Sequence, residues 1–456
     1  MSIPQRRCPA PGCESKGYQA VAWYCEACDE VFCEVHDATH GCGVPGDDEY
    51  WDRTMQTRSI ILHKFLNGLD LRALTKRASV LNGGCECLPI DKDTLDETLM
   101  SGGQHFLVPL DFRTGERWLA RFQRPSNQRP SPAMCQQALL SEVAVYKFLA
   151  SIDFPVPKIF DYAMNEEHSY GIGYGYILME QMNGFPLSSI FDGASQETRT
   201  KILREAAALQ VKLAAHPFHA IGALHEPDAP QVGTLTLSWL DAEFEQPSLG
   251  PFAHSSEFWE ACLHNTWSSQ AGVADIDAYL GFLFMREAVA AMIPSDTSSD
   301  SGNPQFILRH LDDKGDHILI DDDNNIVAVI DWEYSWIVPK ELGLTAPLWV
   351  GEDIGINDEY SLQICPAERE FASFLRDEFA RPDLAVLAET GRKYYYLHRA
   401  CGAVLGSNDF CDHDVPTLLR ALGSQTASWE EWKTAALERY ADDEKLCDLR
   451  ERQSLV

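Results

Sequence analysis

The sequence predicts an α+β protein in which a strand-rich segment is followed by a larger helical one. Residues 95–182 contain short apolar runs separated by turn residues, whereas from Thr198 onward apolar residues recur mostly at helical spacing. A third observation is the Cys- and His-rich start of the chain, which is too short to bury a core of its own. We therefore expect a small metal-binding module, a helical arm, a sheet and a mainly helical part, in that order.

Length and charge limit the classes of function. A chain of 456 residues is too long for one compact core. Its 37 Lys and Arg against 69 Asp and Glu give a net charge of -32, which would repel nucleic acid and anionic membrane surfaces. The first residues lack an apolar leader, and no apolar stretch is long enough to span a bilayer. We expect a cytoplasmic protein that binds neither nucleic acid nor membrane.

The arm and the sheet each have a local signature. Apolar residues at near-helical spacing over Tyr50–Leu81, followed by a Gly pair, predict a helical arm. The apolar runs Phe106–Leu110 and Trp118–Phe122 flank the turn residues Arg113–Glu116, which predicts an antiparallel hairpin.

Further elements follow the hairpin. Residues 138–151 have the pattern of an amphipathic helix, and Tyr174–Met182 that of a strand. Within the helical part, only Ile318–Asp321 and Ile326–Ile330 have strand patterns. A polar loop precedes the first of these two strands, and a turn separates them.

The first 42 residues contain eight side chains that can bind zinc. Two pairs, Cys25 with Cys28 and Cys33 with His36, have two residues between their members, a spacing that lets neighbouring side chains bind one zinc ion. Disulfides or idle thiols are the alternative, but crowding beside histidines favours reduced thiols with a metal role. The candidate ligands are Cys8, Cys13, Cys25, Cys28, Cys33, His36, His40 and Cys42.

This pattern resembles the B-box type of zinc finger, in which ligand pairs alternate between two metals. The resemblance implies one zinc ion held by Cys8, Cys13, Cys33 and His36. It implies a second held by Cys25, Cys28, His40 and Cys42. His40 and Cys42 are close in sequence, so Asp37 or Asp47 could replace one of them. Such closed sites are structural, and we expect the module to recruit a protein partner.

The segment from Phe306 to Glu333 has the layout that phosphoryl transfer needs. One carboxylate must orient the acceptor hydroxyl and take its proton, and ligands a few residues further on must hold the metal that neutralises the phosphates. The segment resembles the catalytic loop and metal-binding turn of the aminoglycoside phosphotransferase family, most closely its fungal branch, within the protein-kinase-like fold. The resemblance implies that Asp312 is the catalytic Asp, His310 opens the loop, and Asp331 binds the metal. The alternative is that both Asp residues are acidic turn residues at strand ends.

His317 departs from the family pattern, which has a metal-binding Asn five residues after the catalytic Asp. Magnesium prefers hard oxygen ligands, so an imidazole would weaken this contact. Asp316 could supply the oxygen, His317 could bind another metal or contact phosphate, or the site could be degenerate. A satisfied polar contact is a further alternative for His317. Asp313 and Lys314 are expected to form a local ion pair or to contact substrate.

The resemblance also implies nucleotide-binding residues upstream. Gly102 and Gly103 would let backbone N–H groups approach phosphates, although Gly pairs also mark plain turns. Arg121 occupies the place of the phosphate-binding Lys, with Glu142 as its ion-pair partner, unless both are solvated. Backbone groups of Glu180 and Met182 would bind adenine; the Met could equally be a core residue.

The resemblance thus predicts a bilobal protein-kinase-like fold, with an antiparallel-sheet N-lobe and a mainly helical C-lobe behind the zinc-binding module. The expected domains are the zinc module, the arm, the N-lobe and the C-lobe with its acceptor-binding helices, at residues 1–46, 47–94, 95–182 and 183–456. The implied activity is transfer of a phosphoryl group from ATP, with Mg²⁺, to a hydroxyl of a small molecule. Two structural Zn²⁺ ions would complete the cofactors. A catalytically silent pseudokinase that acts as a protein-interaction module is the alternative.

Overall fold

The computed structural model divides the chain into two compact units. Among the described residues, unit 1 contains those up to Leu139 together with Lys158–Gln181, and unit 2 contains the rest. The structure describes residues 22–25, 30–33, 61–92, 95, 105–124, 132–191, 193–236, 249–270, 275–293, 305–350 and 362–454.

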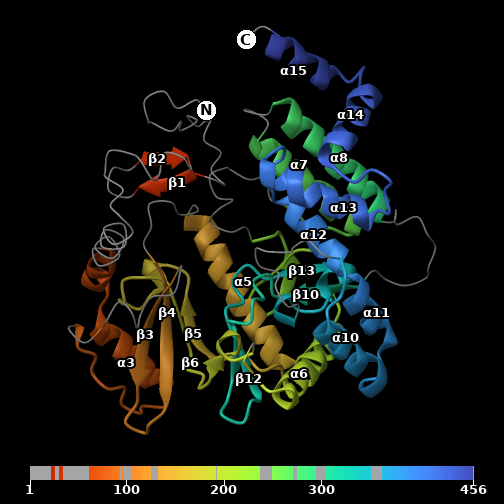
Figure 1. The fold of residues 1–456 in the computed structure, drawn as a ribbon. Coiled ribbons are helices and arrows are strands. Elements are labelled where there is room, and N and C mark those ends of the chain that lie inside the picture. Colours follow the sequence, from red (N-terminus) through yellow and green to blue (C-terminus); the bar gives the residue numbers. More distant parts are fainter. Residues whose placement is uncertain are drawn as a thin grey trace. The chain divides into compact units, whose positions relative to one another are not determined.

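The main sheet of unit 1 is antiparallel, with strand order β3-β4-β6-β5. The unit contains α3 (Leu71–Leu81), β3 (His105–Asp111), β4 (Arg117–Gln123), β5 (Ile159–Ala163) and β6 (Tyr176–Glu180). The predicted hairpin is confirmed, because β3 and β4 pair from His105↔Gln123 to Asp111↔Arg117. Gly115 at φ 89° lies in its turn, a conformation that glycine adopts without strain. The sequence patterns missed β5, which forms the edge beside β6 (Figure 1).

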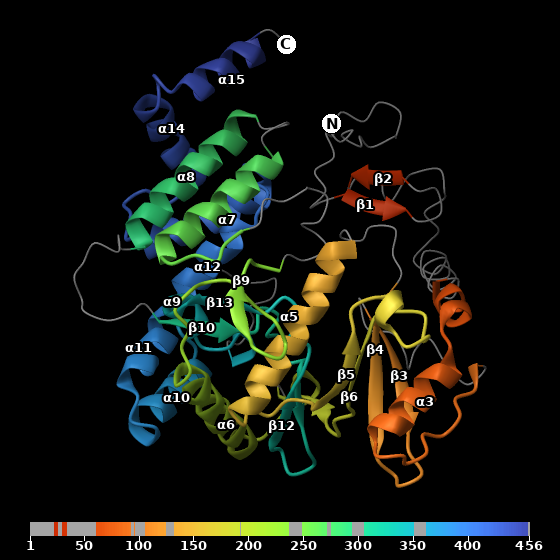
Figure 2. The ribbon, with the colours of Figure 1, turned by 180° about the vertical axis from the view of Figure 1, so that it is seen from behind.

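The helical arm belongs to the core of unit 1. Residues 61–68 are helical, Asp70 caps α3 by accepting hydrogen bonds from two backbone N–H groups, and α3 lies over the strands of the sheet (Figure 2). Phe65 is fully buried, and its ring stacks on that of Phe106 with centroids 4.7 Å apart. Trp118 stacks on Phe160 from the edge strand at 3.7 Å. Aromatic burial therefore holds arm and sheet together.

Unit 2 combines short strands with many helices. Its strands are β7 (Phe185–Pro186), β8 (Ala223–His225), β9 (Gln231–Gly233), β10 (Phe306–Arg309), β11 (Ile318–Ile320), β12 (Ile326–Val329) and β13 (Trp336–Pro339). They form the antiparallel groups β12-β11-β7, β10-β13 and β8-β9. The predicted strands β11 and β12 are therefore present, while the pairing of β10 with β13 was not predicted.

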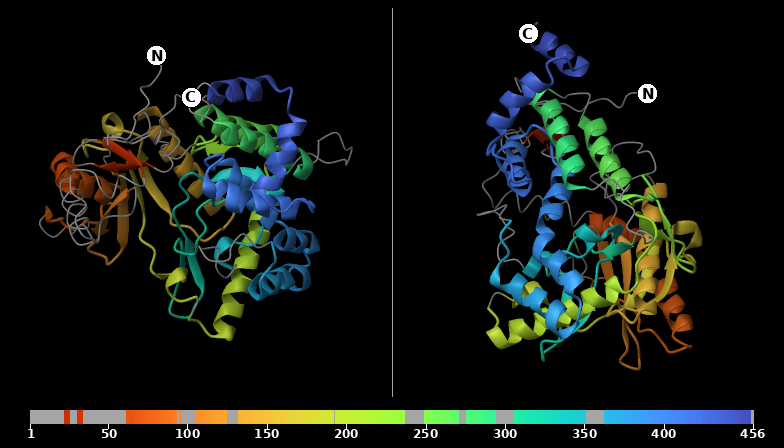
Figure 3. Two further views of the ribbon diagram at one scale, coloured as in Figure 1. Left: turned by 45° about the horizontal axis from the view of Figure 1, so that its top comes forward. Right: turned by 90° about the vertical axis from the view of Figure 1, so that its right-hand side faces the viewer.

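The helices of unit 2 surround these strands. They are α6 (Gln196–Ala214), α7 (Ser255–Gln270), α8 (Ile276–Met292), α9 (Lys340–Gly343), α10 (Pro366–Ser373), α11 (Pro382–Thr390), α12 (Arg392–Cys401), α13 (Val415–Ala421), α14 (Trp429–Arg439) and α15 (Glu444–Ser454). One apolar cluster joins α6, α10 and α11 to β10 and β11 through residues such as Ile202, Phe371 and Ile307. Helices α7 and α8 run side by side (Figure 3).

Helix α5 (Pro132–Ser151) contributes its first residues to unit 1 and the remainder to unit 2. It begins at Pro132, six residues before the predicted start at Ala138. A proline at the first position of a helix is tolerated, because the N–H that it lacks has no partner within the helix there. None of the described helices is both long and apolar enough to cross a membrane.

Candidate active site

The polar segment 310–317 and Asp331 lie at the end of β10, the start of β11 and the end of β12. The loop with His310 and Asp312 follows β10, and β11 begins directly after His317. Strands β11 and β12 pair with Ile318 opposite Val329, and the N–H of Ile330 donates to the carbonyl oxygen of His317 at 2.8 Å. This register places His317 beside Asp331, with Nε2 of the ring 3.4 Å from Oδ2 of the carboxylate.

His317 is the centre of the resulting cluster. Its Nδ1 lies 2.9 Å from the main-chain oxygen of Asp312, 3.9 Å from Oδ2 of Asp312 and 3.8 Å from Oδ1 of Asp316. The structure thus brings together four of the predicted site residues: Asp312, Asp316, His317 and Asp331. The His317 side chain is only 18% exposed, whereas the three carboxylates are 39–54% exposed and accessible to a ligand.

Asp331 is held from two directions. Its N–H donates to the hydroxyl oxygen of Tyr146 in α5 at 3.0 Å, and Nε2 of His310 donates to the carbonyl oxygen of Ile330 at 2.9 Å. The backbone of Asp331 is left-handed, with φ 61°, which is uncommon for a residue other than glycine. Such a conformation persists where the surroundings fix it, as is typical of functional sites. Tyr146 was missed by sequence reasoning, since it lies 185 residues away in the chain.

His310 helps to position the turn that precedes Asp331. Its ring contacts that of Trp332 edge-on, with centroids 4.9 Å apart, and burial lowers the pKa of the imidazole. A ring that stays neutral and donates to a carbonyl fixes the turn before Asp331 without adding charge.

Asp313 and Lys314 are each paired, though not with one another. Lys314 Nζ lies 2.8 Å from Oδ1 of Asp312, and this hydrogen bond raises the pKa of the lysine. Asp313 faces Arg309 at 4.0 Å and accepts a 3.4 Å hydrogen bond from the N–H of Leu348. Burial nonetheless raises the pKa of Asp313 to about 7.

Arg309 lies beneath the loop and is buried. Its guanidinium donates to the hydroxyl of Thr345 at 2.6 Å and to the carbonyl oxygen of Leu342. Burial lowers the pKa of the guanidinium. No pattern in the sequence singled out Arg309 as part of the site, because its partners lie 33 and 36 residues further along the chain.

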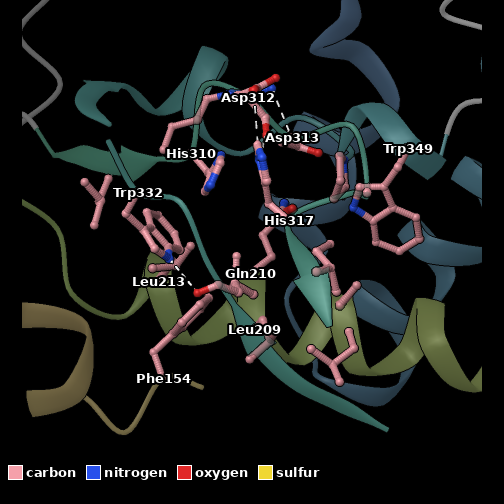
Figure 4. Close-up of a pocket in the computed structure, with 18 of the residues that line it drawn as sticks. Phe154, Leu209, Gln210, Leu213, His310, Asp312, Asp313, His317, Trp332 and Trp349 are labelled. Carbon is pink, nitrogen blue, oxygen red and sulfur yellow. Dashed lines mark hydrogen bonds and ion pairs between the residues drawn. The ribbon is translucent and has the colours of Figure 1, made fainter. Parts of the chain in front are cut away.

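A cavity of about 110 Å³ lies under this loop within unit 2. Figure 4 shows His310, Asp312, Asp313 and His317 along one side of it, and Leu209, Gln210 and Leu213 of α6 along another. Phe154 and Trp332 lie at one end, and Trp349 lies at the other. The loop is therefore supported from below by mainly apolar side chains, a low-dielectric setting that strengthens the electrostatic effects above it.

The other predicted nucleotide-binding residues are distributed over both units. Arg121 in β4 is buried in unit 1, with Nη2 3.0 Å from Nδ1 of His105, while Glu142 in α5 is buried in unit 2. Their ion pair stays a prediction. Glu180 ends β6 and exchanges backbone and side-chain hydrogen bonds with Lys158. Met182 is the first residue after the boundary between the units, and Gly102 and Gly103 lie outside the described residues.

The zinc module is described only at two strands, β1 (Ala22–Cys25) and β2 (Glu30–Cys33), which pair with Cys25 opposite Glu30. The remaining candidate ligands, Cys8, Cys13, Cys28, His36, His40 and Cys42, lie outside the described residues. Over the part of the chain with described side chains, no group of three or more His, Cys, Asp or Glu could hold a metal ion. The eight cysteines after the module carry free thiols.

Residues 101–337, just over half of the chain, match the model of the phosphotransferase enzyme family. The chain belongs to this family. A curated relative, the subtelomeric hrmA-associated cluster protein of Aspergillus fumigatus, is 31% identical over 164 residues. That match covers 35% of this chain and 29% of the relative, so the chain spans less than a third of the relative's length. The kinase-like α+β fold predicted from the sequence is confirmed.

Several solved phosphotransferases are similar in fold. An ethanolamine kinase of Plasmodium vivax is 13% identical with a TM-score of 0.39, covering 76% of this chain and 84% of its own. The ADP-bound aminoglycoside phosphotransferase APH(2'')-Ib is 11% identical with a TM-score of 0.40, covering 70% and 90%. A macrolide 2'-phosphotransferase of type I is 15% identical with a TM-score of 0.39, covering 81% and 98%. The family assignment itself rests on the match over residues 101–337.

Proposed function

We propose that the chain is an ATP-dependent phosphotransferase that transfers a phosphoryl group to a hydroxyl of a small molecule. The observation that carries the proposal is the meeting of Asp312, His317 and Asp331 at the ends of β10, β11 and β12. Membership of the phosphotransferase family supports it. The fungal branch that the motif suggested stays a proposal, supported by the partial match to a protein of Aspergillus fumigatus.

The donor atoms of the cluster fit a divalent cation. Asp331 and Asp316 offer carboxylate oxygens on side chains that are 39% and 46% exposed, and hard cations prefer such ligands. Asp331 would hold Mg²⁺ together with Asp316 or His317. The cation would neutralise charge on the phosphates of ATP.

Asp312 is the proposed catalytic residue. Its carboxylate would orient the acceptor hydroxyl and take its proton as the new O–P bond forms. The bond between the γ-phosphorus and the bridging oxygen breaks, and ADP leaves. With 54% of its side chain exposed, Asp312 is open to an acceptor. The contact with Lys314 holds Oδ1, so Oδ2 is the oxygen left to face the hydroxyl.

The remaining roles are proposed by resemblance to the family. Arg121, paired with Glu142, would steady the phosphates; backbone N–H groups at Gly102 and Gly103 would approach them; and Glu180 and Met182 would bind adenine through their backbones. The eight ligands of the N-terminal module would hold two structural Zn²⁺ ions and present a surface to a protein partner. We further propose that the protein is cytoplasmic.

The direct test replaces Asp312 with Asn. Turnover of ATP with a panel of hydroxylated acceptors should fall by about 10³-fold, within the range for loss of a general base, while nucleotide binding persists. Asp331→Asn should instead abolish metal-dependent binding of ATP, measured by calorimetry. Asp322→Asn, an exposed Asp in the turn between β11 and β12, is the control and should change neither quantity.

Two results would contradict the proposal. One is ATP binding that needs no metal or survives Asp331→Asn undiminished. The other is the absence of phosphoryl transfer to every hydroxylated acceptor despite bound ATP.

A further inference from the structure

The orientation of the His317 ring identifies which nitrogen carries the proton. Nδ1 lies 2.9 Å from the main-chain oxygen of Asp312. A carbonyl oxygen only accepts hydrogen bonds, so Nδ1 is the donor, and in the neutral imidazole Nε2 is left with a lone pair. Histidines that bind metal ions characteristically donate their other ring nitrogen to a backbone carbonyl or carboxylate in this way.

The lone-pair nitrogen lies next to a carboxylate. Nε2 is 3.4 Å from Oδ2 of Asp331; in the neutral ring both atoms are acceptors, whereas a protonated ring would form an ion pair there. A cation near both would turn this repulsion into attraction. Two neighbouring ligands that are each about 2.1 Å from one ion lie roughly 3 Å apart, close to the separation found here.

The two ligands are fixed by contacts that do not involve a metal. Ile330 N–H donates to the carbonyl oxygen of His317 at 2.8 Å, His310 donates to the carbonyl oxygen of Ile330, and Tyr146 accepts from the N–H of Asp331. Because these bonds hold both backbones, the strand register places the two side chains next to each other. Rigid ligand placement of this kind favours binding of an ion that accepts the ligands offered.

We propose that His317, through Nε2, and Asp331 together ligate the catalytic divalent cation, and that the site selects a transition-metal cation such as Mn²⁺ over Mg²⁺. The proposal rests on the proposed function, since it assigns ligands to the same centre. Mg²⁺ demands hard oxygen ligands, whereas first-row transition ions also accept imidazole. With two protein ligands, phosphate oxygens and water would complete the coordination.

The test uses the full chain, produced with isotopically labelled histidine and loaded with Mn²⁺ and ADP. Electron paramagnetic resonance should detect coupling between Mn²⁺ and a labelled histidine nitrogen, and the coupling should vanish in His317→Asn. Labelling separates this signal from the nitrogens of adenine.

Affinity gives a second readout. His317→Asn restores the oxygen donor of the family pattern, so the ratio of Mn²⁺ to Mg²⁺ affinity should fall. We expect a fall of at least about tenfold, because replacing a residue that only supports a metal ligand already costs that much affinity. The matched control is His216→Gln. His216 also places Nδ1 near a main-chain oxygen, that of Lys212 at 3.0 Å, but at the end of α6. This variant should leave coupling and ratio unchanged.

The outcomes separate this inference from the proposed function. Bound Mn²⁺ without histidine coupling would overturn it, as would an unchanged affinity ratio in His317→Asn or no Mn²⁺ binding at all. The first of these results would mean that His317 acts only as a hydrogen-bonding or charged neighbour of Asp331. Phosphoryl transfer could still be present in that case. Conversely, coupling through His317 without any transfer would uphold the ligand assignment and contradict the function.

Discussion

The core of unit 1 and the loop centre of unit 2 bury polar groups in opposite ways. In unit 1, Asp161 accepts hydrogen bonds from Arg77 and from the hydroxyl of Tyr176, each at 2.7 Å, and Tyr176 belongs to the apolar cluster of that unit. In unit 2, Asp313 faces Arg309 only at 4.0 Å, and its Oδ1 has no hydrogen-bond partner among the described residues. Such a buried, incompletely paired carboxyl costs stability, and groups of this kind are common at functional sites.

The largest effect on stability is expected in the apolar core of unit 1. Phe65→Ala removes a fully buried ring that contacts Phe106, Phe122 and Tyr174, and should lower the free energy of unfolding by about 4 kcal/mol. Hydrogen exchange should show loss of protection in β3 and β4. Val80→Ala in α3, where the side chain is 63% exposed, is the control. Equal effects of the two variants would mean that the arm does not stabilise unit 1.

The next largest effect on stability is expected for the buried pair of Arg309 and Asp313, and a second substitution should largely reverse it. At pH 8, Arg309→Met would remove the counter-charge of Asp313, so the buried carboxyl must either stay ionised at a cost or take up a proton, and we expect a loss of about 3 kcal/mol in chemical denaturation. Adding Asp313→Leu removes the stranded carboxylate and should restore much of that loss. A double variant as unstable as the single one would show that Arg309 acts through Thr345 and Leu342 instead of through charge.

A smaller effect is expected from pH. Burial raises the pKa of Asp313 from 3.8 to about 7, so between these values the folded state binds more protons than the unfolded state. The free energy of unfolding contributed by Asp313 therefore falls as pH rises through this window. Relative to Asp313→Asn, the natural protein should lose stability between pH 5 and pH 8, measured by urea unfolding. For the exposed Asp322→Asn, the free energy of unfolding should change with pH as it does in the natural protein. The same pH dependence in Asp313→Asn would refute the raised pKa of Asp313.

The smallest effect should come from the surface ion pair. Lys314 and Asp312 are 62% and 54% exposed, and exposed pairs contribute little because water and salt screen them. Lys314→Met should change the free energy of unfolding by less than about 0.5 kcal/mol, no more than exposed Lys340→Met. A loss well above 1 kcal/mol would place Lys314 with the buried charges beneath the loop.

Sequence patterns predicted the elements that depend on neighbours in the chain. The β3–β4 hairpin is one example, because its turn and both strands lie within about 20 residues. The pairing of β10 with β13 was missed, since Trp336–Pro339 comes from a distant segment and is too short to show a pattern. No prediction was made for β5, which becomes a strand through its contacts with β6.

For the candidate site too, some features follow from the sequence and others only from the tertiary structure. The sequence by itself determined the family, the α+β class and the order of Asp312, His317 and Asp331, because these depend on residue type and spacing. Only the tertiary structure decided that His317 meets Asp331, that Tyr146 and His310 hold the turn, and that Arg309 and Asp313 are buried beneath it. These contacts join residues from separate strands and helices, and their distances and burial are fixed by the packing of the chain, which spacing does not encode.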